Sequence, residues 1–337
     1  MNSVLHKIAF NLPQLNTLFY EFEKTTPSPF EPESILITGL ARSGTTSLLN
    51  ELEKNDKVFS LKYENMPFVL APKLQHVIQN LTGPKINSIE RSHKDGIFIN
   101  KSSPEAFDEV FFKVNEGKNY HFKHHLQQYT SNYIKEYYDF IKHCLFVNQK
   151  SIYLTKNNNH ILRLRQFIET HKFKILLTFR EPLSHASSLL NQHIIHTKLQ
   201  TEEPFALQYM NYLGHHEFGL HQKYFLFEKP RLDTSSFTGN DYWLAQWINY
   251  YQYILELIET YQQDVFLLVN FNDWCGKEPF LISAIEKYID LPIKDKAAYK
   301  EKEKDSFSVD PNLKEMAIAI YNQLLLISSR QCTKKRE

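Results

Sequence analysis

A short glycine-bearing stretch has the residue types and spacing needed to bind a phosphate or sulfate group. Gly39 and Gly44 frame four residues, Arg42 lies inside the frame, and two threonines follow it. Such a loop directs backbone N–H groups at an anion, and the N-terminus of the following helix adds its positive dipole. The planar guanidinium of Arg42 can donate two hydrogen bonds to one pair of oxygens. The candidate anion-binding residues of the loop are Gly39, Arg42, Ser43, Gly44, Thr45 and Thr46.

The loop departs from the pattern of nucleotide-hydrolysing enzymes. Those loops carry lysine after the second glycine, where this sequence has Thr45. Two of the expected strands end at Lys156 and Arg180 rather than at an acidic residue that would hold Mg²⁺. Cations at these positions favour an anionic ligand that is handled without a metal. A glycine turn with an incidental arginine is the alternative interpretation.

A second cationic motif follows a later apolar run. Arg180 ends that run, Pro182 suits the first turn of a helix, and Ser188 lies about two helical turns further on. Six residues of helix advance by ~9 Å, so a stretched arginine and a serine hydroxyl can reach one phosphate. Ligands of open α/β sheets bind beyond the carboxyl ends of the strands. The sequence therefore predicts a second phosphate contact here, with a serine that only packs the helix as the alternative.

The elements that must position these residues are short apolar strands alternating with helices. Strands are expected at 34–38, 57–61, 151–155, 174–179 and 265–270. Helices are expected at 45–54, 122–145, 160–170 and 278–288, with two more that begin at Pro182 and at Asp241, the latter as N-cap. This alternation is typical of a mostly parallel sheet covered on both faces. We predict an α/β phosphate-binding-loop fold, with a mostly parallel central sheet flanked by helices.

The chain is expected to form a single domain over residues 1–337. Its core spans about 34–292, and helical insertions at about 66–150 and 190–240 are expected over the strand ends. The segment 12–33 carries four prolines and is expected to be irregular.

Two further segments are expected at the surface. The charged run 294–304 is predicted to be solvated, and the tail after Ser328 is predicted to fray.

Bulk composition limits the classes of partner. A net charge of +1 is too small to attract nucleic acid or an acidic membrane to the protein as a whole. Any anion-binding site must therefore depend on a local group of charges. The three cysteines are odd in number and form no CxxC pattern, which disfavours disulfides and structural zinc. No apolar run approaches the length of a membrane span or a signal peptide. A cytoplasmic location is expected.

Taken together, the motifs resemble those of sulfotransferases that use 3′-phosphoadenosine 5′-phosphosulfate (PAPS). The loop ITGLARSGTTSLL is similar to the 5′-phosphosulfate motif of this superfamily, in the form of carbohydrate, tyrosyl-protein and many bacterial members. Arg180 and Ser188 resemble its 3′-phosphate motif, with Glu181 where the family has aspartate. The segment 265–292 resembles its strand, turn and helix, with 271–274 as a looser match to the turn.

This resemblance implies transfer of a sulfonate group from PAPS to an acceptor hydroxyl, without a metal. It implies a general base at Glu64, which lies 22 positions after Arg42 and follows the second strand. It also implies that Lys156 stabilises the leaving oxygen together with Arg42. A surface or ion-paired glutamate is the alternative for Glu64. The acceptor is expected to be a hydroxyl of a carbohydrate, a lipid or another small metabolite.

Histidines offer a second source of a base. His193, on the helix that begins at Pro182, is a candidate base or acceptor contact, with a polar lid residue as the alternative. A metal site is not expected, although His193 and His196 are three residues apart, because no acidic or cysteine partners cluster nearby. Trp243 and Trp247 have helical spacing, which favours core packing over a sugar platform.

Two other classes of function stay open at the level of sequence. A small-molecule kinase with a degenerate loop predicts Mg²⁺-dependent nucleotide binding and no preference for a 3′-phosphate. A non-catalytic nucleotide-binding protein predicts donor binding without turnover, unaffected by Glu64→Gln. The pairing of Arg180 with Ser188 argues against the kinase, and the presence of Glu64 and Lys156 argues against the non-catalytic protein.

Overall fold

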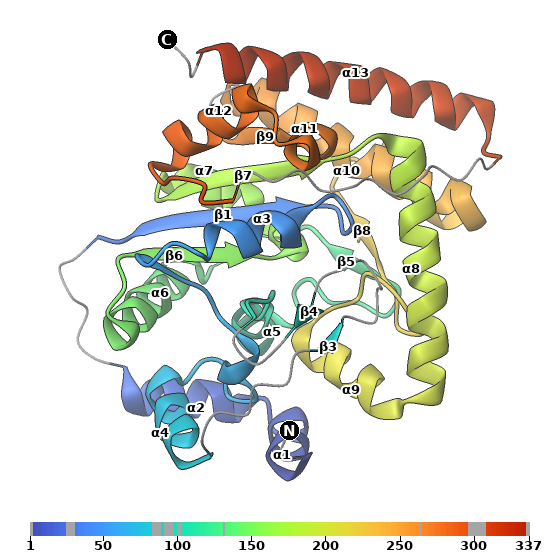
Figure 1. Ribbon diagram of the computed structural model, residues 1–337. Coiled ribbons are helices and arrows are strands. Elements are labelled where there is room, and N and C mark those ends of the chain that lie inside the picture. The colour runs from blue at the N-terminus through green and yellow to red at the C-terminus, as the bar shows by residue number, and fades with distance from the viewer. Residues whose placement is uncertain are drawn as a thin grey trace.

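The centre of the fold is a parallel sheet of five strands in the order β2-β6-β1-β7-β9. Figure 1 shows the computed structural model, which describes residues 3–24, 31–82, 89–90, 98–99, 103–130, 132–262, 265–295 and 308–334. The strands are β1 (Glu33–Gly39), β2 (Val58–Phe59), β6 (Ile152–Lys156), β7 (Phe173–Phe179) and β9 (Leu267–Asn270). The predicted fold class, a mostly parallel sheet flanked by helices, is confirmed.

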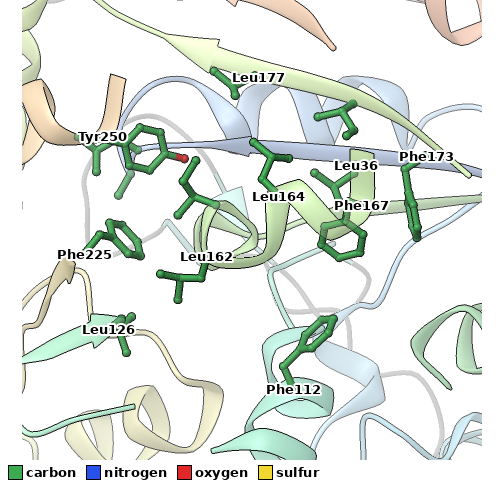
Figure 2. Packing of buried hydrophobic residues seen from close by; sticks show 14 of the residues in the cluster. Leu36, Phe112, Leu126, Leu162, Leu164, Phe167, Phe173, Leu177, Phe225 and Tyr250 are labelled. Atoms are coloured by element: carbon green, nitrogen blue, oxygen red, sulfur yellow. The ribbon is translucent and has the colours of Figure 1, made fainter. Parts of the chain in front are cut away.

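Both faces of the sheet are covered, which explains why its strands are continuously apolar. Ile35 and Ile37 of β1 pack on one side with α3 (Thr45–Leu52) and α12 (Pro279–Ile289). Leu36, between them, points to the opposite core, because side chains alternate along a strand. Figure 2 shows Leu36 and Leu177 in that second core, together with Phe112, Phe167 and Tyr250. The helices that contribute to this side include α5 (Glu109–Glu116), α6 (Ile134–Asn148), α7 (Leu164–Thr170) and α10 (Gly239–Tyr261).

The register of the sheet brings the candidate motifs to one edge. Ile37 of β1 is paired with Lys156 at the end of β6, and Gly39 with Thr178 near the end of β7. All these strands run in the same direction, so the loops that follow them open at the same edge. The chain continues there into α3, into the 3₁₀ turn η2 (Asn158–Arg163) and into α8 (Pro182–Glu202).

The N-terminal segment differs from the prediction, which was wrong to treat 12–33 as irregular. The structure has α1 (Ser3–Asn11) and α2 (Gln14–Glu23). Pro13 directly precedes α2 with φ −58°, a value that suits a helix start. Asn16 and Tyr20 face the interior one helical turn apart. Two of the other prolines that suggested irregularity, Pro27 and Pro29, lie outside the described residues.

The insertion between β2 and β6 is less helical than predicted. The expected helix 122–145 begins only at Ile134, because β5 (His125–Gln127) pairs in parallel with β8 (Tyr224–Leu226). The other elements of this insertion are η1 (Tyr63–Asn65), α4 (Pro72–Thr82), β3 (Ile89–Glu90) and β4 (Phe98–Ile99). The second insertion adds α9 (Pro204–Leu213) and η3 (Thr234–Ser236). The expected helix 160–170 is divided between η2 and α7.

The C-terminal tail is helical as far as Lys334, and the prediction that it frays after Ser328 was wrong over these residues. The last helix, α13 (Pro311–Lys334), lies along the outside of β9, as Figure 1 shows. Gln331 accepts a hydrogen bond from Leu268 N at 2.9 Å and donates one to Phe266 O at 2.9 Å. Ser328 donates to Leu268 O. These side chains satisfy backbone groups on an edge strand that would otherwise be open to pairing.

Three smaller predictions can also be compared with the structure. The prediction that Asp241 is an N-cap was wrong: α10 has Thr238 as its N-cap, and Asp241 lies in the first turn, where it accepts a hydrogen bond from Asp310 N. Of the charged run 294–304, Lys294 and Asp295 are exposed, and the rest lies outside the described residues. All three cysteines are buried and none of them forms a disulfide.

Candidate anion-binding site

The candidate loop connects β1 to α3 through two residues with positive φ. Gly44 is the N-cap of α3 with φ 95°, and Arg42 has φ 73°. A β-carbon on Gly44 would lie 2.7 Å from Cδ2 of Phe271. Only glycine satisfies both the backbone conformation and the close approach of that ring. Arg42 is a non-glycine residue in a strained conformation, of the kind that persists only where its surroundings hold it.

The loop is supported from the neighbouring strand β7. Ser43 is fully buried, and its hydroxyl lies 2.6 Å from Thr178 Oγ1 and donates to Leu40 O at 2.7 Å. A β-carbon on Gly39 would lie 2.2 Å from Thr178 Oγ1, so this contact requires glycine at the strand end. The side chain of Ser43 therefore braces the loop from inside. Thr45 is buried, whereas Thr46 is half-buried.

The structure joins the two anion motifs directly. Arg42 Nε donates a hydrogen bond to Ser188 Oγ at 3.3 Å, which links the loop to α8. The guanidinium of Arg180 lies over the ring of Phe271, 4.5 Å from its centroid. Phe271 thus contacts both Gly44 and Arg180. The expected pairing of Arg180 with Ser188 on one phosphate stays a prediction, and the side chain that Ser188 contacts here is Arg42.

Glu181 has a structural role at the start of α8. It is the N-cap of α8, and its carboxylate accepts hydrogen bonds from Leu183 N at 3.1 Å and Ser184 N at 2.7 Å. An acidic N-cap satisfies backbone donors and complements the helix dipole, as aspartate would. Glu181 therefore fixes the start of the helix that carries Ser188.

Lys156 has a partner that sequence reasoning missed. Its side chain is 7% exposed, and Nζ lies 3.6 Å from Oε1 of Glu105, whose side chain is equally buried. Glu105 lies in a loop that pairs with the chain after β2, where its N–H donates to Leu61 O. Since no local spacing relates Glu105 to Lys156, the sequence contains no signal for this pair.

Glu64 lies on η1, the single 3₁₀ turn after β2, and is half-buried. The preceding Tyr63 donates from its hydroxyl to Glu105 Oε2 at 3.5 Å. The structure therefore connects the turn of Glu64, through Tyr63 and Glu105, to Lys156. It places the candidate base and the candidate lysine on neighbouring segments at the end of β2 and β6.

A buried acidic network holds the chain that follows Lys156. Asn157 donates to Glu109 at 2.7 Å, and Glu109 forms a fully buried ion pair with Arg163 at 2.9 Å. Burial opposes the charge of Glu109, but Arg163 and the hydrogen bonds from Tyr120 and Asn157 together outweigh it and hold the pKa of Glu109 below its ordinary value. Asp108 accepts hydrogen bonds from Tyr153 and Thr155, and its burial raises its pKa. These carboxylates are positioned to hold the loop after β6.

The side chain of the candidate residue His193 packs against α10. Its ring lies 5.5 Å from that of Trp243, and its Nδ1 accepts a hydrogen bond from Gly219 N. Burial lowers the pKa of His193. It lies five residues after Ser188 on α8, a rotation of about 140° around the helix. The structure thus brings Arg42 and Ser188 into contact, whereas His193 packs against Trp243 on another side of α8. Trp243 and Trp247 are core residues, as predicted.

Within the described residues, the structure contains no group of three or more histidine, cysteine, aspartate or glutamate side chains arranged to hold a metal ion. The helices described also include none with the length and apolar character required to span a bilayer.

Comparison with known proteins finds similarity at the level of solved structures. The sequence matches no family model and no curated protein. A sulfotransferase from Mycobacterium tuberculosis is similar with a TM-score of 0.45 and 11% identity, over 97% of this chain and 81% of that one. One from Mycobacterium avium has a TM-score of 0.42 and 12% identity, over 96% and 72%. One from Alicyclobacillus acidocaldarius has a TM-score of 0.40 and 13% identity, over 91% and 100%.

Proposed function

We propose that this chain is a sulfotransferase that moves a sulfonate group from PAPS to an acceptor hydroxyl. The observation that carries the proposal is the hydrogen bond from Arg42 Nε to Ser188 Oγ. It makes the loop after β1 and the helix after β7 parts of one site, and Arg180 stands at the adjacent strand end. A ligand with a sulfated phosphate at one end and a second phosphate at the other matches a site built from two anion-binding motifs.

The donor groups of the site fit PAPS. Gly44 is the N-cap of α3, whose N-terminal N–H groups are donors suited to an anion, and Arg42 lies two residues before it. We assign the loop Gly39–Thr46 to the 5′-phosphosulfate, with Ser43 bracing it from within, and Arg180 and Ser188 to the 3′-phosphate. Arginine at both positions matches the planar oxygen pairs of phosphate and sulfate.

The catalytic roles follow from charge. PAPS supplies an activated sulfur: a bond from sulfur to the acceptor oxygen forms as the bond to the bridging oxygen breaks, releasing adenosine 3′,5′-bisphosphate. Glu64 accepts the hydroxyl proton as general base. Lys156 and Arg42 stabilise the negative charge that develops on the bridging oxygen. His193 is not assigned a role in this scheme, because it packs against Trp243.

The acceptor is a hydroxyl of a carbohydrate, a lipid or another small metabolite. We treat residues 1–337 as one domain whose insertions, 66–150 and 190–240, bound the acceptor side of the site. Glu105 lies in the first of these insertions, and Glu64 lies in the chain just before it.

The test is a calorimetric titration with adenosine 3′,5′-bisphosphate in EDTA, beside AMP and ATP. The proposal expects metal-free binding that selects for the 3′-phosphate and is lost in Arg180→Ala. Unselective binding, with ATP binding only when Mg²⁺ is present, would favour a kinase instead. Selective binding with no turnover on any hydroxyl acceptor, and no effect of Glu64→Gln, would favour a non-catalytic binding protein.

A further inference from the structure

His185 lies beneath the anion-binding loop and is fully buried. It occupies the first turn of α8, where its own N–H donates to Glu181 O. Its ring nitrogen Nε2 lies 2.7 Å from the backbone oxygen of Ala41. A carbonyl oxygen can only accept a hydrogen bond, so Nε2 carries the proton and donates it. A side chain on the helix after β7 therefore holds the backbone of the loop after β1.

The imidazole is neutral near physiological pH. Burial, and then the nearby charges of Arg180 and Arg42, lower the pKa of His185 to about 3. A neutral ring with its proton on Nε2 keeps the donor that the Ala41 carbonyl needs. It does so without placing a buried charge beside the two half-buried arginines.

The geometry of the peptide bond extends this contact to Arg42. The oxygen of Ala41 and the N–H of Arg42 belong to one planar peptide group, and in the trans form they point in opposite directions. A donor that fixes the oxygen therefore fixes the direction of the Arg42 N–H. Arg42 also has φ 73°, a conformation that its surroundings must maintain.

We propose that His185 is a positioning residue that locks the Ala41–Arg42 peptide plane and so holds the loop in its anion-binding conformation. This inference rests on the proposed function, because it assigns the loop to an anion. His185 acts through the backbone and does not itself contact the ligand.

The test measures the affinity of full-length variants for adenosine 3′,5′-bisphosphate near neutral pH. His185→Leu removes the donor and is expected to weaken binding about tenfold, the effect of one lost hydrogen bond to a buried carbonyl. His185→Gln keeps an N–H donor and is expected to restore most of the affinity. The matched control is His196→Leu on the same helix, where the buried ring stacks on Phe218, and it is expected to bind like the wild type.

A purely structural role for His185 would give a different pattern. In that case His185→Leu would lower the melting temperature, and the folded protein would bind the bisphosphate with unchanged affinity, which would overturn the inference. Equal losses in His185→Gln and His185→Leu, or an equal loss in His196→Leu, would overturn it as well. A wild type that does not bind the bisphosphate would overturn the proposed function and this role with it.

A further variant keeps the test decisive if His185→Leu does not fold. His185→Asn carries the same amide one carbon shorter, so its N–H falls short of Ala41 O. It is expected to bind as weakly as a variant without a donor, and its loop amides 40–45 are expected to exchange faster than those of His185→Gln. Equal affinity and equal exchange in the two amide variants would overturn the inference.

Discussion

Arg42 on the loop after β1 and Ser188 on the helix after β7 are 146 residues apart in the chain and are joined by a hydrogen bond of 3.3 Å. Gly44 and Arg180 both lie against the ring of Phe271. The two motifs thus share one set of contacts, and a change in one is expected to alter the other. This coupling can be measured even before an acceptor is known.

Arg42→Lys retains the charge but removes the Nε donor and the planar fork. We expect it to weaken binding of adenosine 3′,5′-bisphosphate more than Ser188→Ala does, because lysine cannot form the bidentate contacts. Since both variants disrupt one hydrogen bond, their effects should not add, with a coupling energy of about 1 kcal/mol. Titration of the two single variants and the double variant measures this. Ser187→Ala is the control, and strictly additive effects of Arg42→Lys and Ser188→Ala would contradict the predicted coupling.

The sequence predicted the sheet better than the contacts at its edge. Buried parallel strands are short apolar runs bounded by glycine or polar residues, so β1, β6, β7 and β9 could be recognised from local pattern alone. The same local reasoning selected Arg42, Arg180 and Ser188 as candidates, since each stands at a fixed distance from a strand end. It could not find the contact between Arg42 and Ser188, which depends on how α8 lies against the loop.

The missed features depend on contacts between distant segments. Glu105 reaches Lys156 only because its loop pairs with the chain after β2. The segment 271–274 resembled a turn but forms the start of α11 (Phe271–Gly276), whose N-cap is Asn270. The end of α13 lacked a clear signal because the side chains that dock it, such as Gln331, are polar and bind the backbone of β9.

Gly44→Ala is expected to destabilise the protein and to weaken anion binding. The left-handed conformation alone costs a residue with a β-carbon about 1–2 kcal/mol, and the new carbon would lie 2.7 Å from the Phe271 ring. Gly239→Ala is a matched control, because Gly239 also has a positive φ of 57° but has no atom within 4 Å of the added carbon. Unfolding in denaturant should show a larger loss for Gly44→Ala. Equal losses would mean that the ring moves aside without penalty.

Removing one partner of the Lys156–Glu105 pair is expected to destabilise the fold. Both side chains are 7% exposed, and breaking a buried ion pair leaves an uncompensated charge, at a cost of about 3 kcal/mol. We therefore expect Glu105→Gln to be less stable than the double variant Glu105→Gln/Lys156→Met, which has no buried charge to compensate. Denaturant unfolding of the three proteins measures this order.

The exposed pair Lys198–Glu202, with side chains 76% and 62% exposed, serves as the control. Glu202→Gln should change stability by less than about 1 kcal/mol. A Glu105→Gln variant as stable as the wild type would show that Lys156 does not need its carboxylate partner. Such a result would also weaken the assignment of Glu105 as a fixed neighbour of the candidate base.

Buried histidines are expected to make the protein less stable in mild acid. Burial, assisted by neighbouring cations, lowers the pKa of His185 to about 3, of His121 to about 4 and of His216 to about 2. In the unfolded chain each has a pKa near 6.5, so below that pH the unfolded state binds protons that the folded state does not. The stability contributed by each neutral ring is therefore present above pH ~6.5 and is lost as the pH falls toward the folded pKa.

The size of the effect can be assigned to single residues. Each such histidine adds up to about 1.4 kcal/mol per pH unit to the slope of stability against pH. The Nε2 atoms of His121 and His216 are 2.7 Å apart. The charges of Lys113 and Lys223 oppose protonation of both histidines, whereas Glu109 favours protonation of His121. Urea unfolding at a series of pH values between 7 and 5 measures the slope. The glutamine of His185→Gln does not titrate in this range, so this variant should reduce the slope by the contribution of one histidine. An unchanged slope would mean that His185 is protonated in the folded protein as readily as in the unfolded chain.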